Sequence, residues 1–185
     1  NHSHSYDYFA LSSNYQNIRV RYFHGFLESN LNKVNRYING RGLEWTNQKS
    51  INVALTEIII YSGENRPLDI AYLNPMASHL EIELNNRLNI TGSDGANAIW
   101  QLSSDIMLNN GIRISGNYFY DEFVLDKEGD LQGKEHGKGY SLRLSKTKRK
   151  SNGIFTIYCS LISIGTPVFR HGNGNNNFVQ RGRPL

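Results

Sequence analysis

The chain has 185 residues, of which 38% are hydrophobic and 19% charged; this balance excludes an intrinsically disordered chain and allows one domain with a sizeable core. The formal net charge is +4, and the sequence pI is near 9.2. This mildly basic balance does not by itself indicate nucleic-acid binding, although it favours contact with an anionic membrane surface or a phosphorylated substrate.

A single cysteine limits the covalent chemistry of the chain. Cys159 lies in the apolar run IFTIYCSLISI, which predicts a buried, structural thiol. With one cysteine the chain forms no internal disulfide, and it has no cysteine-based zinc motif. No apolar run reaches the roughly 18 residues of a membrane-spanning helix. The first residues, NHSHSYDYFA, do not have the pattern of a secretory signal.

The first half of the chain is predicted to be mainly helical. Residues 1–13 show no period and are expected to form a flexible arm. Apolar residues recur at helical spacing toward the end of residues 14–38. Residues 50–61, SINVALTEIIIY, are apolar on most sides, which is typical of a buried helix capped by Ser50. A third helix is expected after Pro75, with an apolar stripe of residues spaced four apart. That stripe consists of Met76, Leu80, Leu84 and Leu88.

The second half of the chain has the alternation of β-strands. Four segments separated by polar turns are predicted to form an antiparallel sheet. These segments are residues 98–108, 110–125, 140–144 and 154–164. The predicted fold class is therefore α+β, with N-terminal helices packed on a curved antiparallel sheet or half-barrel formed by the C-terminal half. Residues 14–169 form this single domain, and residues 170–185, rich in Gly, Asn and Arg, form an irregular tail.

The second of these strands is the main candidate for chemistry. Tyr120 and Asp121 are adjacent near its end, and Asp126 and Lys127 follow at the turn. A carboxylate, a phenol and further charges are groups that acid–base or metal-assisted chemistry uses. Alternation in a regular strand places Tyr118 and Tyr120 on one face and Asp121 on the other. The alternative interpretation is an ordinary surface strand whose polar residues face solvent.

Two basic segments and one loop are secondary candidates. The cations of SKTKRKSNG, residues 145–153, would attract phosphates or an anionic bilayer, or would simply form a solvated turn. Arg170 and His171 begin RHGNG, whose glycine amides could hold a phosphate. His136, in the loop GKEHGKG, could act as a general acid or base if the loop folded over a site.

Residues 53–77 resemble the middle of colicin M-type bacteriocins. The likeness lies in VALTEIIIYSGENRPLDIAYLNPMA, and downstream NGIRISGNYFYDEF and the following KEG fall in register with the family's catalytic strand. The resemblance covers about residues 48–145. The matching positions in the first stretch are Val53, Ala54, Leu55, Tyr61, Gly63, Arg66, Asp69, Ile70, Ala71, Pro75 and Met76.

The resemblance implies a toxin domain with a half-barrel of strands. Such proteins cleave the lipid-linked peptidoglycan precursor, lipid II, at its pyrophosphate in the periplasm, with a divalent metal such as Mg²⁺. The family's motif is Asp-x-Tyr-Asp followed by His-Arg, and by register Tyr120 and Asp121 match its Tyr and second Asp. Tyr118 stands where the family has its first Asp, and Lys127-Glu128 stand where it has His-Arg. Because a tyrosine neither binds magnesium nor acts as such a base at neutral pH, cleavage of this kind would need a site rebuilt from other residues.

The rebuilt site is assigned to neighbouring residues. Under this interpretation Asp121 and Asp126 hold Mg²⁺, Lys127 faces the pyrophosphate, His136 replaces the missing imidazole, and Tyr120 completes the catalytic set. Pyrophosphate cleavage needs the charge on the leaving phosphate to be neutralised, which a metal and a lysine supply. Substrate binding is assigned to Tyr118, Arg143, Arg170 and His171.

The function expected from this interpretation is that of an antibacterial toxin domain, secreted or delivered to the periplasm of a target bacterium. Its partners would be the lipid-linked cell-wall precursor, a membrane surface and an immunity protein. Two alternatives stay open. One is a toxin or effector domain of the same fold with a different target, such as nucleic acid bound through residues 146–150 and the Arg-rich tail, or a membrane. The other is an interaction module without chemistry.

Overall fold

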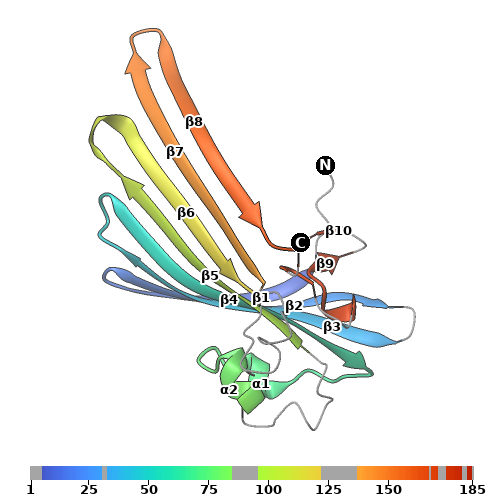
Figure 1. Cartoon of the computed structure of the whole chain (residues 1–185). Coiled ribbons are helices and arrows are strands. Elements are labelled where there is room, and N and C mark those ends of the chain that lie inside the picture. The colour runs from blue at the N-terminus through green and yellow to red at the C-terminus, as the bar shows by residue number, and fades with distance from the viewer. Residues whose placement is uncertain are drawn as a thin grey trace.

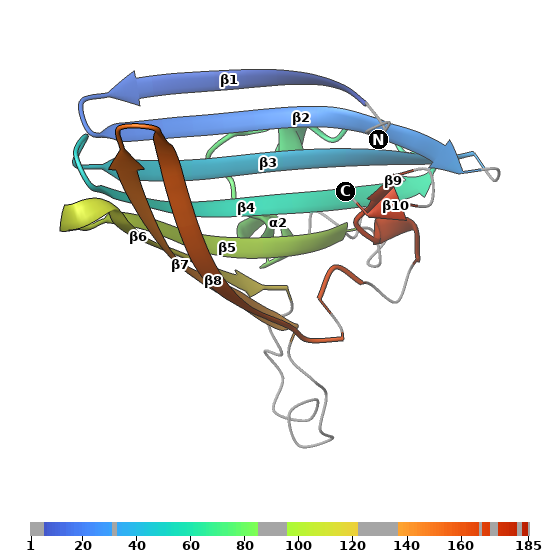
Figure 2. The same ribbon diagram turned by 90° about the horizontal axis from the view of Figure 1, so that it is seen from above.

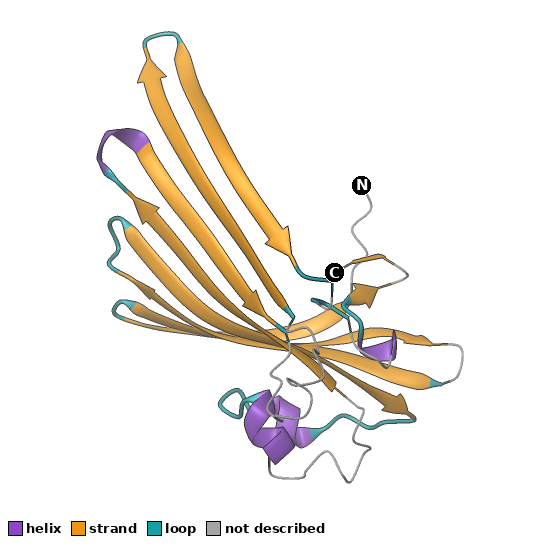
Figure 3. Cartoon of the chain, viewed as in Figure 1, coloured by secondary structure: helices purple, strands orange, loops and turns teal. Residues whose placement is uncertain are grey.

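The computed structural model describes residues 6–30, 33–84, 96–121, 137–166, 168–170, 174–180 and 183–184. These residues are mainly β-strand: eight strands form one open antiparallel sheet in which strands that follow one another in sequence lie side by side (Figure 1; Figure 3). The strands are β1 Asp7–Tyr15, β2 Ile18–Asn30, β3 Val34–Thr46, β4 Ile51–Glu64, β5 Ala96–Met107, β6 Ile112–Tyr120, β7 Lys138–Lys150 and β8 Gly153–Ile164.

The helices of the described residues are short. The two α-helices are α1, Ile70–Leu73, and α2, His79–Leu84, and both follow β4 in the chain. Figure 1 shows them together below the sheet, whereas the small C-terminal strands β9 and β10 lie on its other side. The remaining elements are the 3₁₀ turns η2 Asn109–Gly111 and η3 Gly174–Asn176 and the small hairpin of β9 Val179–Gln180 and β10 Arg183–Pro184.

The predicted α+β fold is wrong, because the described residues form one open antiparallel sheet with two short helices, and the first two predicted helices are strands. The described part of residues 14–38 falls in β1, β2, β3 and turns, and residues 50–61, predicted as a buried helix, fall in β4 and the turn before it. Residues 7–13, expected to belong to a flexible arm, pair residue by residue with β2. The β-branched residues of INVALTEIII suit an extended strand better than a helix, and their alternation over Ile51–Leu55 is that of a strand.

The strands predicted in the second half are confirmed, with different lengths. Residues 98–108 and 154–164 correspond closely to β5 and β8, and β7 extends beyond the predicted residues 140–144 at both ends. Most of the basic segment is strand, since β7 continues to Lys150 and the turn is only two residues long. The strand predicted at residues 110–125 is seen as β6, which ends at Tyr120.

Short turns join the strands at one end of the sheet. The Asn47 side-chain oxygen accepts hydrogen bonds from the backbone N–H groups of Lys49, Ser50 and Ile51, and this closes the turn between β3 and β4. In the turn between β5 and β6, Gly111 has a φ of 72°, and a Cβ there would overlap the carbonyl oxygen of Thr147. The turn residues therefore fix the register of the strands on either side.

Both faces of the sheet are covered at the opposite end. On one face α1, α2 and the residues between them cover a buried cluster. On the other face a second cluster is covered by residues 168–170 and 174–178, which we call the C-terminal segment. The first cluster contains Tyr37, Ile59, Tyr61, Tyr72, Ala77, Ile82 and Ala98, and the second contains Leu27, Ile38, Ile60, Ile99 and Phe178. The strands twist strongly, so that β8 crosses over the direction of β1 when the sheet is seen from above (Figure 2).

Candidate functional site

Asp121, the central residue of the predicted catalytic site, lies immediately after β6 and is 7% exposed. Its carboxylate oxygen Oδ2 accepts a hydrogen bond from the backbone N–H of Phe169, and its own N–H donates to the carbonyl of Gly137 at 2.8 Å. The ring of Phe169 packs edge-on against Phe119 of β6. Asp121 therefore holds the C-terminal segment against the sheet.

The other described residues of the predicted site do not converge on Asp121. Tyr118 and Tyr120 share one face of β6; Lys138 Nζ lies 5.6 Å from the centroid of the Tyr120 ring. Arg143 lies on the opposite face from these tyrosines, with its guanidinium carbon 4.2 Å from the ring centroid of Tyr158. Arg170, the last of the predicted site residues that the structure describes, is exposed. Asp126, Lys127, His136 and His171 lie outside the described residues.

The described residues do not fit a magnesium site. Asp121 is the one predicted metal ligand among them, and its Oδ2 accepts a backbone hydrogen bond. Across the described ranges, no group of three or more His, Cys, Asp or Glu side chains is placed to hold a metal ion. Mg²⁺ prefers several oxygen ligands in near-octahedral geometry, which one buried carboxylate cannot provide.

An exposed apolar face is the dominant feature of the sheet. The register places side chains from all eight strands in one row that crosses the whole sheet, and the six central members of the row are large, apolar or aromatic and 38–52% exposed. The row is Ser13, Val20, Leu43, Leu55, Leu102, Tyr118, Tyr140 and Ser163. We call the side of the sheet that carries this row the apolar face.

Two neighbouring rows extend the apolar face toward the turns. One contains Tyr15, Ile18, Trp45, Val53, Ser104, Gly116, Leu142 and Leu161, and the other contains Ile51, Ile106, Ile114, Leu144 and Cys159. None of the residues in these three rows is charged. Soluble monomers rarely expose a contiguous apolar surface of more than a few hundred square ångströms, so a face of this extent marks a contact surface.

The opposite side of the sheet, which we call the polar face, carries hydrogen-bonding side chains behind the three apolar rows. Gln101 donates to Asn117 at 2.8 Å and Asn117 donates to Ser141 at 3.1 Å, a ladder across β5, β6 and β7. Arg113 Nε donates to Asp105 at 2.7 Å. A further row on this face is Asn14, Arg19, Glu44, Ala54, Ser103, Asn117, Ser141 and Ile162. At these rows β1 to β7 are thus amphipathic with a period of two residues, whereas β8 is apolar on both sides, with Ile154, Tyr158, Ile162 and Ile164 exposed on the polar face.

A buried polar cluster holds α1 and α2 on the apolar face. The rings of Tyr61 and Tyr72 stack with centroids 4.3 Å apart, and His24 Nε2 lies 2.8 Å from the Tyr61 hydroxyl. Glu57 pairs with Arg41 at 3.1 Å and accepts a hydrogen bond from the backbone N–H that begins α2. Burial raises the pKa of Glu57 and of Tyr61 and lowers the pKa of His24. Because His24 and Tyr61 are fully buried, a substrate cannot reach them, and we assign the cluster a structural role.

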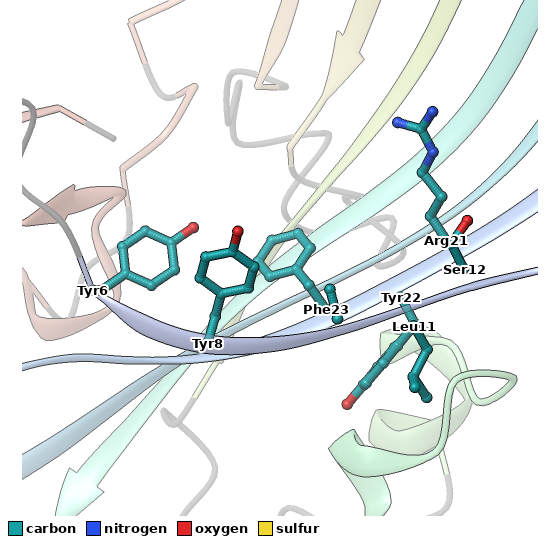
Figure 4. Close-up of a pocket in the computed structure, with 8 residues that line it drawn as sticks. Tyr6, Tyr8, Leu11, Ser12, Arg21, Tyr22 and Phe23 are labelled. Atoms are coloured by element: carbon teal, nitrogen blue, oxygen red, sulfur yellow. The ribbon is translucent and has the colours of Figure 1, made fainter.

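A shallow depression of about 300 Å³ lies beside β1 and β2 (Figure 4). Figure 4 shows Tyr6, Tyr8 and Phe23 on one side of the strands with Arg21, whereas Tyr22 and Leu11 point to the other side. Two glycines leave room for these rings, because a Cβ on Gly25 would overlap Tyr6 and one on Gly40 would overlap Phe23. Arg21 pairs with Glu44 at 3.5 Å, so the charge at this depression is already balanced. The remaining residues that line it are Ala10 and Ser12.

Prediction from sequence missed the apolar face, although the signal was present. Leu43 and Trp45, Val53 and Leu55, and Leu142 and Leu144 each stand two positions apart with smaller or polar residues between them. In the first half of the chain, apolar residues that also fit helical spacing favoured a helix prediction over this alternation. The resemblance to colicin M-type bacteriocins rests on residues 53–77, which form most of β4, α1 and the loops that follow them, and on NGIRISGNYFYDEF, which contains β6.

Comparison with known proteins yields no relative: no protein-family model, curated protein or solved structure matches the chain. Among the described residues, no helix has both the length and the apolar character needed to cross a membrane.

Proposed function

We propose that this chain is a membrane-binding protein whose sheet lies with its apolar face against lipid hydrocarbon. The observation that carries the proposal is the row from Val20 to Tyr140, in which six successive strands each present a large apolar or aromatic side chain that is about half exposed. Burying apolar surface contributes roughly 25 cal/mol per Å², so leaving such a face in water is unfavourable.

Lipid fits this face better than a protein partner does. Protein interfaces form about one hydrogen bond per 100–200 Å², whereas hydrocarbon offers none and penalises any charge. The three rows of the apolar face contain no charged residue. Their alternation with a hydrogen-bonded polar face is the pattern of strands that contact lipid on one side.

The residues that flank the apolar rows support the same proposal. Tyr15 and Trp45 lie near the turns, where aromatic side chains favour the membrane–water interface. Beyond the apolar rows, Lys146, Lys148 and Lys150 share the same face of β7 and are placed to meet anionic headgroups.

Cleavage of lipid II stays a prediction from the resemblance alone. A lipid-contacting sheet is compatible with a lipid-linked substrate, and a membrane-active domain was one of the alternatives that the sequence left open. The structure, however, shows Asp121 packed against Phe169, and among the described residues it brings no second predicted catalytic side chain to that carboxylate. Incubating the domain with lipid II and Mg²⁺ tests this prediction, which fails if the intact domain gives no turnover.

Paired charge substitutions test lipid contact directly. Leu102 and Ser103 are neighbours on β5 that face opposite sides of the sheet. A lysine in contact with hydrocarbon costs about 2–4 kcal/mol near the bilayer centre. We therefore expect Leu102→Lys to reduce co-flotation with phospholipid vesicles by at least tenfold, whereas Ser103→Lys leaves it near the wild-type level. Equal flotation of the two variants, or a wild-type protein that does not float, would overturn the proposal.

A further inference from the structure

The two outer edges of the sheet have almost no charge. β8, GIFTIYCSLISI, contains neither a charged residue nor a proline in its twelve positions, and β1, DYFALSSNY, contains one charge, that of Asp7. In the described part of the chain β8 pairs only with β7, and β1 pairs only with β2. Both strands therefore present a long row of backbone N–H and C=O groups that no other described strand covers.

Sheet proteins in water usually protect such edges. The common devices are short edge strands, lysines, prolines and bulges that turn the edge away. The cations in this part of the sheet lie one strand inward, on β7, which carries Lys146, Lys148, Arg149 and Lys150. An uncharged edge of twelve residues invites pairing with another strand. In hydrocarbon the need is greater, because each backbone group without a partner costs several kcal/mol.

The two edges match each other in chemistry and direction. On the apolar face β8 presents Phe155, Ile157 and Leu161, and β1 presents Phe9 and Leu11. Strands alternate in direction across the antiparallel sheet, so β1 and β8, at opposite ends of an even number of strands, run in opposite directions. When β1 of a second copy lies beside β8 with its apolar face on the same side, the two strands are antiparallel. The amphipathic sheet of one copy then continues into the next.

We propose that β8 of one copy pairs with β1 of a second copy in the membrane. The inference rests on the proposed function, since contact with hydrocarbon is what makes open edges so unfavourable. The contact joins two different surfaces, so it is head-to-tail: each copy offers β8 to one neighbour and β1 to the other. The shared face then runs without a break from one copy to the next.

The lone cysteine gives a direct test. Cys159 lies on the apolar face of β8 and is exposed, and opposite residues of an antiparallel pair have Cα atoms about 4.5–5.5 Å apart, which suits a disulfide. We choose Phe9→Cys, Leu11→Cys and Ser13→Cys on the apolar face of β1, each with Cys159 retained. In vesicles under mild oxidation, at least one of these variants is expected to give disulfide-linked bands at multiples of the monomer mass. The wild type is expected to give none, because two β8 strands do not meet.

Matched controls define the outcomes that overturn the proposal. Leu55→Cys places a cysteine on the same face of β4, in the middle of the sheet, and is expected to stay monomeric with Cys159. Dimers of the wild type through Cys159 would show that β8 meets β8 and would overturn the proposal, as would monomers for all three β1 variants. Vesicle flotation on the same samples separates the two claims. Flotation without cross-links removes the pairing and leaves lipid contact standing, whereas a lack of flotation removes both.

Discussion

Leu55 of β4 and Leu102 of β5 lie directly opposite each other on the apolar face, and both side chains are nearly half exposed. In a water-soluble sheet such a pair would be covered by a helix or a second sheet. Here α1, α2 and the residues near them cover only the far end of this face, around Tyr61 and Ile59. The proposed contact with lipid is therefore centred on this pair.

Replacing this pair with polar residues is expected to have opposite effects in water and in lipid. The double variant Leu55→Gln/Leu102→Gln removes apolar surface, so it should aggregate less than wild type in detergent-free buffer while binding vesicles several-fold more weakly. Light scattering and flotation measure the two effects. Thr56→Gln/Ser103→Gln, on the polar face of the same strands, serves as the control. Reduced solubility of the first variant in water would contradict this account.

Asp121 is expected to act as an anchor for the C-terminal segment. Its carboxylate accepts the N–H of Phe169, and hydrogen bonds to charged groups contribute about 1.5–3 kcal/mol. Asp121→Ala should therefore expose residues 168–170 to proteolysis and speed amide exchange at Phe169, whereas Asp121→Asn, which keeps an acceptor, should do so less. Unchanged exchange in Asp121→Ala would show that the carboxylate does not hold the segment.

The strands of the second half could be predicted from sequence because each has one polar face or a clear turn on either side. β4 could not, because its last third is covered on both sides. Ile59 and Tyr61 lie under α1 and α2, whereas Ile60 packs with Phe178 on the other side, so the run IIIY is apolar at every position and reads equally well as a buried helix. Local pattern cannot tell these apart, since the covering segments come from elsewhere in the chain.

The surroundings of Asp121 could not be predicted from sequence either. The resemblance assigns Tyr120 and Asp121 to one catalytic set, although alternation in a regular strand places their side chains on opposite faces. In the structure the strand ends between them, and Asp121 binds a backbone group of Phe169, 48 residues away. The sequence carries no signal for that partner, because Asp near a strand end most simply predicts a local turn and not a bond to a distant segment.

The buried imidazole of His24 predicts a loss of stability in mild acid. Burial lowers the pKa of His24 below its ordinary value of roughly 6.5. Between the folded and unfolded pKa values the unfolded chain binds a proton that the folded chain does not, so the free energy of unfolding falls as pH drops below about 6.5 and is unaffected above it. Burial raises the pKa of Glu57, so its contribution has the opposite sign: the free energy of unfolding falls as pH rises above the ordinary pKa of a glutamate.

Comparing the wild type with His24→Gln isolates the pH effect of the histidine, because both proteins contain Glu57. Urea unfolding in detergent micelles at pH 7.5 and 5.5 is expected to show a larger acid-side loss for the wild type, by up to about 1.4 kcal/mol per pH unit. If both proteins lose the same stability on acidification, His24 does not titrate in the way that its burial requires.

The close approach of Phe23 to Gly40 predicts a strong effect of a small substitution. A Cβ on Gly40 would overlap the Phe23 ring, so Gly40→Ala should destabilise the fold by about 1–3 kcal/mol. Adding Phe23→Leu should recover part of that loss. Gly153→Ala, at a position where the nearest atom is 4.0 Å from the added Cβ, is expected to be close to neutral. Thermal unfolding in micelles measures all three, and an unaffected Gly40→Ala would show that the ring moves freely.

Quenching of Trp45 by brominated lipid tests lipid contact most directly. Trp45 lies on the apolar face of β3 and is 42% exposed, and Trp100→Phe leaves it as the chain's sole tryptophan. In vesicles whose acyl chains carry bromine near the headgroup, we predict that most of the Trp45 fluorescence is lost, whereas aqueous iodide has little effect. Full fluorescence in brominated vesicles, together with strong quenching by iodide, would show that the apolar face does not meet lipid.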